Sequence, residues 1–317
     1  MGFKKITVLG GGVLGSQIAY QTAYSGFDVT VWLRSAASVE RSKPKLERWK
    51  KIYLDTLESY RAQCGSRSPY FARGLVNSLE SLTGEEIDAK KARAEAAAAA
   101  IRFELDLTAA VQDADLVIEA LAEDPQQKTD MYRRLADVLP EKTVIVTNSS
   151  TLLPSMFAAA TGRPEKYLAL HFANEIWKNN TAEVMGHPGT EQKYYDEVAD
   201  FAEEIHMVPL RLKKEQPGYI LNSLLVPFLS AAEALLAKDV ADPQTIDMTW
   251  KLATGAPAGP FQILDIVGLT TAYNIVIMQP EAGNPDSVQG RIAATLKKYI
   301  DAGKTGITAG EGFYKYH

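Results

Sequence analysis

The chain has 317 residues, a formal net charge of −5 and an ordinary globular composition, with 46% hydrophobic and 23% charged residues. This length predicts two domains, with a core large enough to need no disulfide staples. The mild negative charge argues against sequence-independent binding to nucleic acid. Cys64 is the only cysteine, so no intrachain disulfide can form, and we expect a cytoplasmic protein. The apolar runs are too short or too interrupted for a targeting or membrane-spanning segment, so we expect no membrane partner.

Strand and helix signals alternate along the first two thirds of the chain. In chain order we expect a strand at 5–9, a helix at 14–25, a strand at 28–33, helices at 43–63 and 85–100, a strand at 115–121, a helix at 126–138, a strand at 143–147, a helix at 154–161, a strand at 167–170, a helix at 190–205 and a strand at 207–212. Such alternation predicts a doubly wound α/β fold, with a parallel sheet covered by helices on both faces.

Strand signals stop after residue 214, and helical patterns take over. We expect helices at 218–236, 243–253 and 287–300. The sequence therefore predicts a Rossmann-type doubly wound domain over residues 1–210. An all-α C-terminal domain is predicted over residues 211–317.

A glycine-rich turn follows the first predicted strand. Gly10-Gly11-Gly12-Val13-Leu14-Gly15 fits the G-x-G-x-x-G pattern. In that pattern Gly10 permits the tight turn, Gly12 lets a pyrophosphate approach the backbone, and Gly15 lets the helix pack on the strand. Val13 and Leu14 begin the helix, whose free N–H groups attract an anion. Because the motif follows a strand and opens a helix, we predict a dinucleotide site rather than a plain glycine turn.

The end of the second predicted strand indicates which dinucleotide binds. NAD enzymes place an acidic residue there to bond the ribose hydroxyls, but this chain has Leu33 at that position. Arg34 can pair with a 2′-phosphate and Ser35 can donate a hydrogen bond to it. We therefore predict that NADP(H) is preferred over NAD(H). The alternative is that Arg34 is an ordinary exposed loop arginine.

Six further runs carry a family resemblance. They are, in order, Val117-Ile118-Glu119-Ala120-Leu121, Thr147-Asn148-Ser149-Ser150-Thr151, His171-Phe172-Ala173-Asn174, Pro217-Gly218-Tyr219-Ile220-Leu221-Asn222, Gly259-Pro260-Phe261-Gln262-Ile263-Leu264-Asp265 and Gly310-Glu311-Gly312-Phe313-Tyr314-Lys315-Tyr316. Together they resemble the 3-hydroxyacyl-CoA dehydrogenase family over essentially the whole chain, and its diketoreductase-like bacterial members in particular. The ordered set is far more specific than any single run.

The resemblance implies an acid–base pair formed by His171 and Glu183. It also implies that Ser150 and Asn222 hold the substrate oxygen or order the site. These residue types suit the reduction of a ketone, because imidazole can give and take a proton near neutral pH. A carboxylate fixes the tautomer of the ring, and neutral donors stabilise charge that grows on the oxygen.

Three more residues are assigned through the same resemblance. Glu123 and Lys128 match the family's cofactor-contacting pair, and Asn148 lies in the loop beside the nicotinamide. The resemblance also implies a homodimer formed through the helical domain. We expect no metal, because one cysteine and scattered histidines offer no ligand spacing.

The segment after the histidine motif departs from the family pattern. Glu175 stands where the family usually has proline, and Ser223 replaces an arginine. Trp177 and the polar run 178–180 replace a more apolar loop, which predicts a short or polar acyl pocket. The alternative is that Lys178 simply points to solvent.

The predicted function is hydride transfer between NADP(H) and a 3-keto or 3-hydroxy substrate, with short-chain 3-hydroxyacyl-CoA as the leading candidate. Acetoacetyl-CoA and 3-hydroxybutyryl-CoA represent that class. The departures leave open a CoA-independent reductase of 3-keto or 3,5-diketo acids and esters, or a sugar-acid 3-dehydrogenase. A non-catalytic NADPH-binding sensor or structural protein is the alternative of another class.

Overall fold

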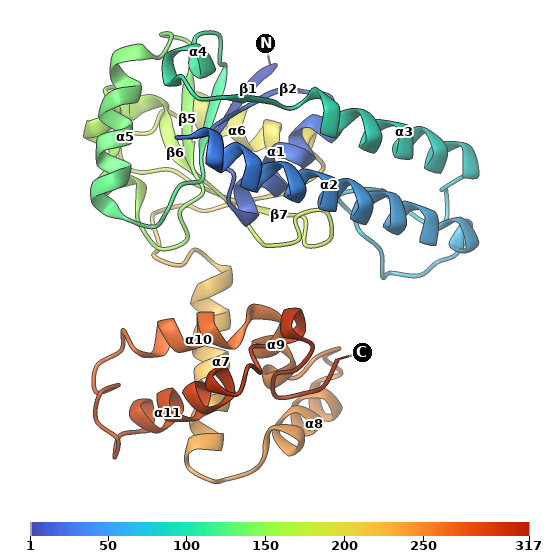
Figure 1. Cartoon of the computed structure of the whole chain (residues 1–317), viewed down its shortest axis with the longest axis vertical. Helices are drawn as coiled ribbons and strands as arrows, with labels where there is room; N and C mark the ends of the chain where they lie inside the picture. The colour runs from blue at the N-terminus through green and yellow to red at the C-terminus, as the bar shows by residue number, and fades with distance from the viewer. Residues whose placement is uncertain (1, 317) are drawn as a thin grey trace. The chain divides into compact units, whose positions relative to one another are not determined.

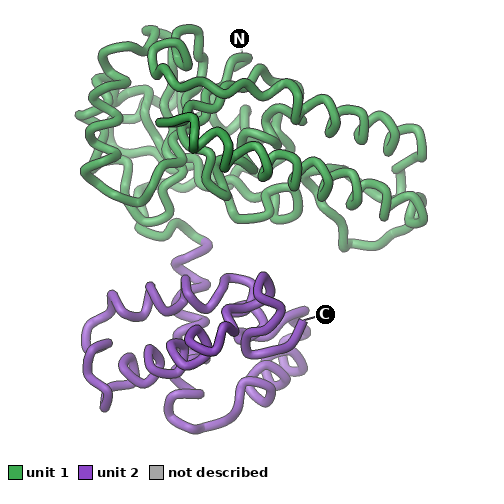
Figure 2. Tube along the Cα trace, viewed as in Figure 1, with its two compact units in different colours: residues 1–220 green, residues 221–317 purple. Residues whose placement is uncertain are grey.

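A computed structural model describes residues 2–316, which form two compact units: unit 1, residues 2–220, and unit 2, residues 221–316 (Figure 2). The sequence had suggested a boundary at 210/211, whereas the units divide at 220/221. The connecting segment stays with unit 1 because Leu212 and Tyr219 are buried there beside Ala169 and Met185. Each unit is described by itself.

Unit 1 is built on an eight-stranded sheet of order β3-β2-β1-β4-β5-β6-β7-β8. The strands are β1 (Lys5–Leu9), β2 (Asp28–Trp32), β3 (Arg102–Glu104), β4 (Leu116–Glu119), β5 (Val144–Thr147), β6 (Tyr167–Phe172), β7 (Thr181–Met185) and β8 (Val208–Arg211). Every neighbouring pair is parallel except β6 and β7. The predicted parallel sheet is confirmed, with one reversed pair that the sequence did not reveal.

Helices cover both faces of this sheet (Figure 1). One apolar core unites α1 (Val13–Tyr24), α2 (Ala36–Ser59), α3 (Gly84–Ala100) and α6 (Gln192–Glu204) with one face. A second core holds α4 (Leu107–Val111) and α5 (Pro125–Val138) against the other. Four short 3-10 helices lie between these elements: η1 (Arg61–Gln63), η2 (Pro154–Met156), η3 (Ala158–Thr161) and η4 (Pro164–Lys166).

Two helix predictions were wrong in detail. The helix expected at 154–161 is instead the pair η2 and η3, interrupted at Phe157, whose φ of −118° is not helical. The helix expected from residue 43 begins seven residues earlier, at Ala36. Ser35 caps it by accepting a hydrogen bond from the Ser38 N–H, and Pro44 is accommodated inside the helix.

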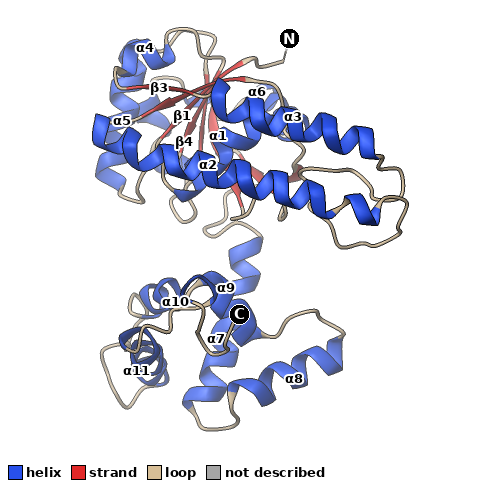
Figure 3. Cartoon of the chain, turned by 45° about the vertical axis from the view of Figure 1, so that its right-hand side comes forward, coloured by secondary structure: helices blue, strands red, loops and turns tan. Residues whose placement is uncertain are grey.

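Unit 2 contains helices and no strand among its described residues (Figure 3). They are α7 (Leu221–Ala237), α8 (Pro243–Thr254), α9 (Pro260–Val267), α10 (Leu269–Val276), α11 (Val288–Asp301) and the short η5 (Ile307–Ala309). The predicted all-α character is confirmed, although α9 and α10, of eight residues each, had been missed. Over residues 2–316 we find no helix with the length and apolar character needed to cross a bilayer.

Buried Asp265 ties the C-terminal segment to unit 2. Its carboxylate accepts hydrogen bonds from the backbone N–H groups of Phe313 and Tyr314 and from the hydroxyl of Tyr316. Asp265 therefore helps to fix the last motif of the chain to the helical core.

Candidate active site

The order of the strands reverses between β1 and β4, so the loops after these two strands leave a crevice at the carboxyl edge of the sheet. Two cavities of about 520 and 350 Å³ open there, and Gly12, Ala120 and Leu121 line both. The larger extends toward α2 and α5, and the smaller toward Ser150 and Thr151. We call the two together the edge groove.

The glycine loop forms the floor of the edge groove. Gly10 has φ of +108°, and a Cβ there would lie 2.7 Å from the carbonyl oxygen of Ala120. At Gly15 a Cβ would lie 2.4 Å from the Gly10 carbonyl oxygen, so the start of α1 packs closely on the loop. At Gly12 a Cβ would meet nothing within 4 Å. The backbone is thus open at Gly12, where the motif predicts a pyrophosphate, and Val13 and Leu14 line the same cavity.

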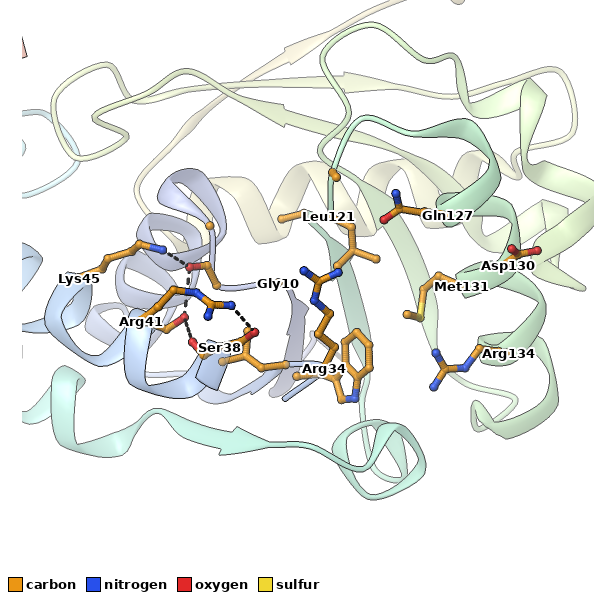
Figure 4. A pocket seen from close by; sticks show the side chains of 17 residues that line it. Gly10, Arg34, Ser38, Arg41, Lys45, Leu121, Gln127, Asp130, Met131 and Arg134 are labelled. Carbon is orange, nitrogen blue, oxygen red and sulfur yellow. Dashed lines mark hydrogen bonds between the residues drawn. The ribbon is translucent and has the colours of Figure 1, made fainter. Parts of the chain in front are cut away.

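The end of β2 lies at the α2 side of the larger cavity (Figure 4). Leu33 is buried, and Arg34 is exposed and lines the cavity. Ser35 does not line it, because its hydroxyl caps α2 and hydrogen bonds with the hydroxyl of Ser38 at 3.0 Å. Ser38 lines the cavity instead, which the sequence did not indicate.

His171 and Glu183 lie directly opposite each other on the antiparallel pair β6 and β7. This register brings the histidine Nδ1 to 3.0 Å from the glutamate Oε2, with both side chains buried. The histidine Nε2 lies 3.2 Å from the hydroxyl oxygen of Ser150. Three of the four residues predicted for catalysis therefore form one connected chain. Strand β7 had not been predicted, and it explains the pairing.

Tyr219 and Ile220, the last residues of unit 1, contact the pair formed by His171 and Glu183. The Ile220 N–H donates to the Oε1 of Glu183 at 2.8 Å. The Tyr219 ring stacks on the imidazole of His171 with 4.4 Å between centroids and 10° between planes. The Tyr219 hydroxyl donates to the Ser149 carbonyl at 2.7 Å, and the residue has a left-handed φ of +54°. Such backbone conformations persist where the surroundings enforce them.

Beneath the edge groove, buried Glu119 at the end of β4 organises a polar network that sequence reasoning missed. One carboxylate oxygen accepts from the Lys128 ammonium at 2.7 Å and from the Leu121 N–H at 2.7 Å. The other accepts from the hydroxyls of Tyr132 and Thr147, both at 2.8 Å. Lys128 is only 1% exposed, so it lies below the groove surface. The sequence contains one signal for this network: Glu119 ends an otherwise apolar strand and precedes Lys128 by nine positions.

Glu123 and Asn148 line the smaller cavity of the edge groove. One Glu123 oxygen accepts from the Ser149 hydroxyl and from the Thr151 N–H and hydroxyl. Burial pushes the pKa of Glu123 up, but these hydrogen bonds outweigh it and hold that pKa below its ordinary value. Asn148 accepts from the Phe172 N–H at 3.1 Å and lines the smaller cavity. Both side chains thereby fix the loop that carries Ser150.

Two other predicted features lie elsewhere. Asn222 is the second residue of α7 and belongs to unit 2, so its role stays a prediction. Trp177 is buried in unit 1 against the rings of Trp49 and Tyr53, at 5.5 and 5.6 Å between centroids. Lys178 is 64% exposed beside Glu175. The hypothesis that the Trp177 loop shapes a short substrate pocket was wrong for the tryptophan, because α2 already packs against it.

Comparison with known proteins agrees with the sequence motifs. A model of the 3-hydroxyacyl-CoA dehydrogenase NAD-binding domain matches residues 5–216, and one of the C-terminal domain matches residues 218–316. The chain is 32% identical to human mitochondrial hydroxyacyl-coenzyme A dehydrogenase, over 99% of this chain and 91% of that protein. It is 30% identical to a probable 3-hydroxybutyryl-CoA dehydrogenase of Bacillus subtilis, over 100% and 98% of the two chains.

A solved structure of a diketoreductase, described as a dual catalyst of dicarbonyl compounds, is 46% identical over the full length of both chains. The TM-score between the two folds is 0.85. The chain thus belongs to the 3-hydroxyacyl-CoA dehydrogenase family and is an oxidoreductase of that type.

Proposed function

We propose that this protein transfers hydride between NADP(H) and a 3-keto or 3-hydroxy group, with His171 as the acid–base catalyst. The observation that supports this most is the placement of His171 between Glu183 and Ser150. Ser150 lines the cavity that also contains the start of α1. Proton transfer would therefore take place beside the predicted coenzyme site.

The hydrogen bonds to His171 assign a role to each nitrogen. Nδ1 faces Glu183, an acceptor, so we infer that the ring carries its proton there. In the imidazolium, Nε2 on the Ser150 side carries a second proton, which it gives to the substrate oxygen during reduction and takes back during oxidation. Glu183 stabilises the imidazolium, and its second oxygen is fixed by the Ile220 N–H. Ser150 offers a neutral donor to the same oxygen.

The edge groove fits a dinucleotide. It combines an open backbone at Gly12, the N-terminus of α1 and exposed Arg34 at the end of β2. When bound, the nicotinamide supplies or accepts the hydride. We infer a preference for NADP(H), because Leu33 cannot accept a hydrogen bond from the ribose and no acidic side chain follows β2 directly.

Two classes of substrate are candidates, one without CoA and one with it. The 46% identity to a diketoreductase favours a small dicarbonyl compound without CoA. Hydroxyacyl-CoA relatives at 30–32% identity favour a short-chain acyl-CoA. The replacement of the usual arginine by Ser223 supports the first candidate, which thereby moves ahead of the acyl-CoA expected from sequence.

A substrate panel tests this proposal. The purified protein is given NADPH or NADH with ethyl acetoacetate, a 3,5-diketo ester, acetoacetyl-CoA and a C16 3-ketoacyl-CoA, and nucleotide oxidation is followed at 340 nm. We expect turnover of the small 3-keto compounds and a higher kcat/KM with NADPH. Tight NADPH binding without turnover of any member would instead support a non-catalytic sensor.

We also propose that the protein forms a homodimer through unit 2. That unit exposes large apolar side chains, including Leu224 at 69%, Leu252 at 80% and Met278 at 76%. Exposed apolar surface of this kind is typical of interfaces. Light scattering coupled to size-exclusion chromatography should give a mass near twice that of the 34.7 kDa chain, and a monomer mass would contradict it.

A further inference from the structure

A second set of positive side chains lines the larger cavity beside Arg34. Arg41 and Lys45, one helical turn apart on α2, reach the same space (Figure 4). Ser38, which lies one turn before Ser42 on this helix, lines the cavity with them. We call Arg41, Lys45 and Ser38 the α2 cluster.

The cations of the α2 cluster have no carboxylate partner among the described residues. Arg41 Nη2 donates to the Ser38 hydroxyl at 2.9 Å, and Lys45 Nζ donates to the Gly11 carbonyl at 2.6 Å. Other lysines of α2 are neutralised locally, since Lys43 pairs with Glu40 and Lys51 with Asp55.

Acidic charge in the cavity wall is limited and already matched. Among the described lining residues, Asp130 on α5 is the only acidic one, and Arg133 lies 3.7 Å from its carboxylate. Arg134 lines the same wall, with its guanidinium 5.7 Å from the centre of the Trp32 ring. The larger cavity therefore presents a surplus of positive charge without a bound partner within the protein.

The α2 cluster also lies at the correct place for one particular anion. In dinucleotide folds the adenosine ribose lies between the glycine loop and the residue after the second strand. Here a Cβ on Gly11 would lie 2.2 Å from the Ser42 hydroxyl and 3.0 Å from Leu33, so this face of α2 adjoins both. In Figure 4, Arg34 extends toward Leu121, while Arg41 and Lys45 lie on the other side of Gly10.

We propose that Arg41 and Lys45, assisted by the Ser38 hydroxyl, form the binding site for the 2′-phosphate of the coenzyme. Arg34 is then one contributor among three cations. This rests on the proposed use of NADP(H). It implies that discrimination against NADH lies mainly on α2, so changing Arg34 alone leaves a clear preference for NADPH.

Equilibrium binding tests the site without depending on turnover. Kd is measured by calorimetry for NADPH and NADH, and for the fragments adenosine 2′,5′-bisphosphate and 5′-AMP. The test variant is Arg41→Met with Lys45→Met. The matched control is Lys43→Met with Lys51→Met, which removes the same charge from the same helix outside the cavity.

We expect the test variant to weaken the binding of NADPH and of the bisphosphate by about a hundredfold or more, because two charge-assisted contacts to the phosphate are lost together. NADH and 5′-AMP should change by less than about threefold, a shift below 1 kcal/mol. The control should bind all four as the unmodified protein does.

Equal weakening of all four ligands, or an unchanged Kd for NADPH, would overturn the assignment. An equal loss in the control would show a general field effect instead of a site. If the test variant does not fold, Kd for the same four ligands is measured for Arg41→Met alone and for Lys45→Met alone. Each value is then compared with that of the unmodified protein. A substrate panel without turnover, combined with the expected Kd pattern, would reject the proposed reaction and keep this site.

Discussion

The two ends of the edge groove are built on opposite principles. At the Ser150 end the ionisable groups are buried and each has a partner: His171 has Glu183, and Lys128 has Glu119. At the α2 end, Arg41 is exposed and Lys45 half-buried, and their hydrogen bonds go to neutral oxygens.

The difference follows from what each end has to do. Buried charges stay charged only when partners replace the water they lose, so the Ser150 end is fixed before any ligand arrives. Exposed cations keep their hydration and are available to an incoming anion. The Ser150 end is therefore suited to holding the reacting groups in a fixed geometry, and the α2 end to binding an anionic ligand.

The largest expected effect is at the Ser150 end. His171→Ala removes the acid–base group, so we expect turnover to fall by about 10²–10⁴-fold. The Kd for NADPH should change little, because the α2 cluster is untouched. Steady-state kinetics and calorimetry on one preparation give both numbers. Normal turnover of a good substrate by this variant would exclude His171 from the reaction.

Stability should depend strongly on the matched charges as well. Lys128→Met leaves Glu119 buried beside two hydroxyls without its cation, and we expect a loss of about 3–5 kcal/mol in the free energy of unfolding. Lys297→Met, which breaks an exposed pair with Asp301, serves as control and should change the free energy of unfolding far less. Equal losses in urea unfolding would mean that the Glu119 network adds nothing beyond a surface pair.

Much of this architecture could be predicted from sequence, for physical reasons. The glycine loop and the strand ends are local patterns that predicted the fold class, and the ordered motifs pointed through the family resemblance to His171, Glu183 and Ser150 as candidate residues. The helix expected from residue 43 begins at Ala36 instead, so the sequence did not predict that Arg41 lies on α2.

Other features depend on contacts that are distant in sequence. The antiparallel strand β7 is five residues long and carries Glu183 among apolar residues, so its pairing with β6 is visible only in the folded sheet. The Trp177 loop looked like a substrate wall, but the partner that buries it comes from α2. The partners of Glu119 likewise come from two other elements.

Glu233 shows how a buried carboxyl without a matching partner behaves. Glu233 on α7 is 5% exposed, and its Oε1 has no hydrogen-bond partner among the described residues. Burial raises the pKa of Glu233 from 4.5 to about 7. The folded state therefore favours the neutral acid, and the stability from this group is complete below pH 4.5 and lost as pH rises through 7.

Glu233→Gln should remove that pH dependence. We expect the variant to match the unmodified protein at pH 4.5 and to be more stable at pH 8 by about 1–3 kcal/mol. Thermal unfolding at the two pH values measures the difference. A variant that is less stable at both would indicate that the carboxylate is paired and charged in the folded protein.

The smallest effect concerns salt. The exposed cations of the α2 end are screened by added ions, whereas the buried pair at His171 is screened much less. Raising NaCl from about 50 to 500 mM should narrow the ratio of NADH to NADPH Kd values several-fold, with kcat at saturating substrate nearly constant. A ratio independent of salt would mean that discrimination does not rest on exposed charge.

Transfer of labelled hydride tests the central claim most directly. NADPH carrying deuterium at both C4 positions is incubated with ethyl acetoacetate and either the unmodified protein or the His171→Ala variant, and the product is analysed by mass spectrometry and NMR. We predict one deuterium on C3 of the 3-hydroxy ester with the unmodified protein, and product formation at least about a hundredfold slower with the variant. Product without deuterium at C3, or equal rates for the two proteins, would contradict hydride transfer assisted by His171.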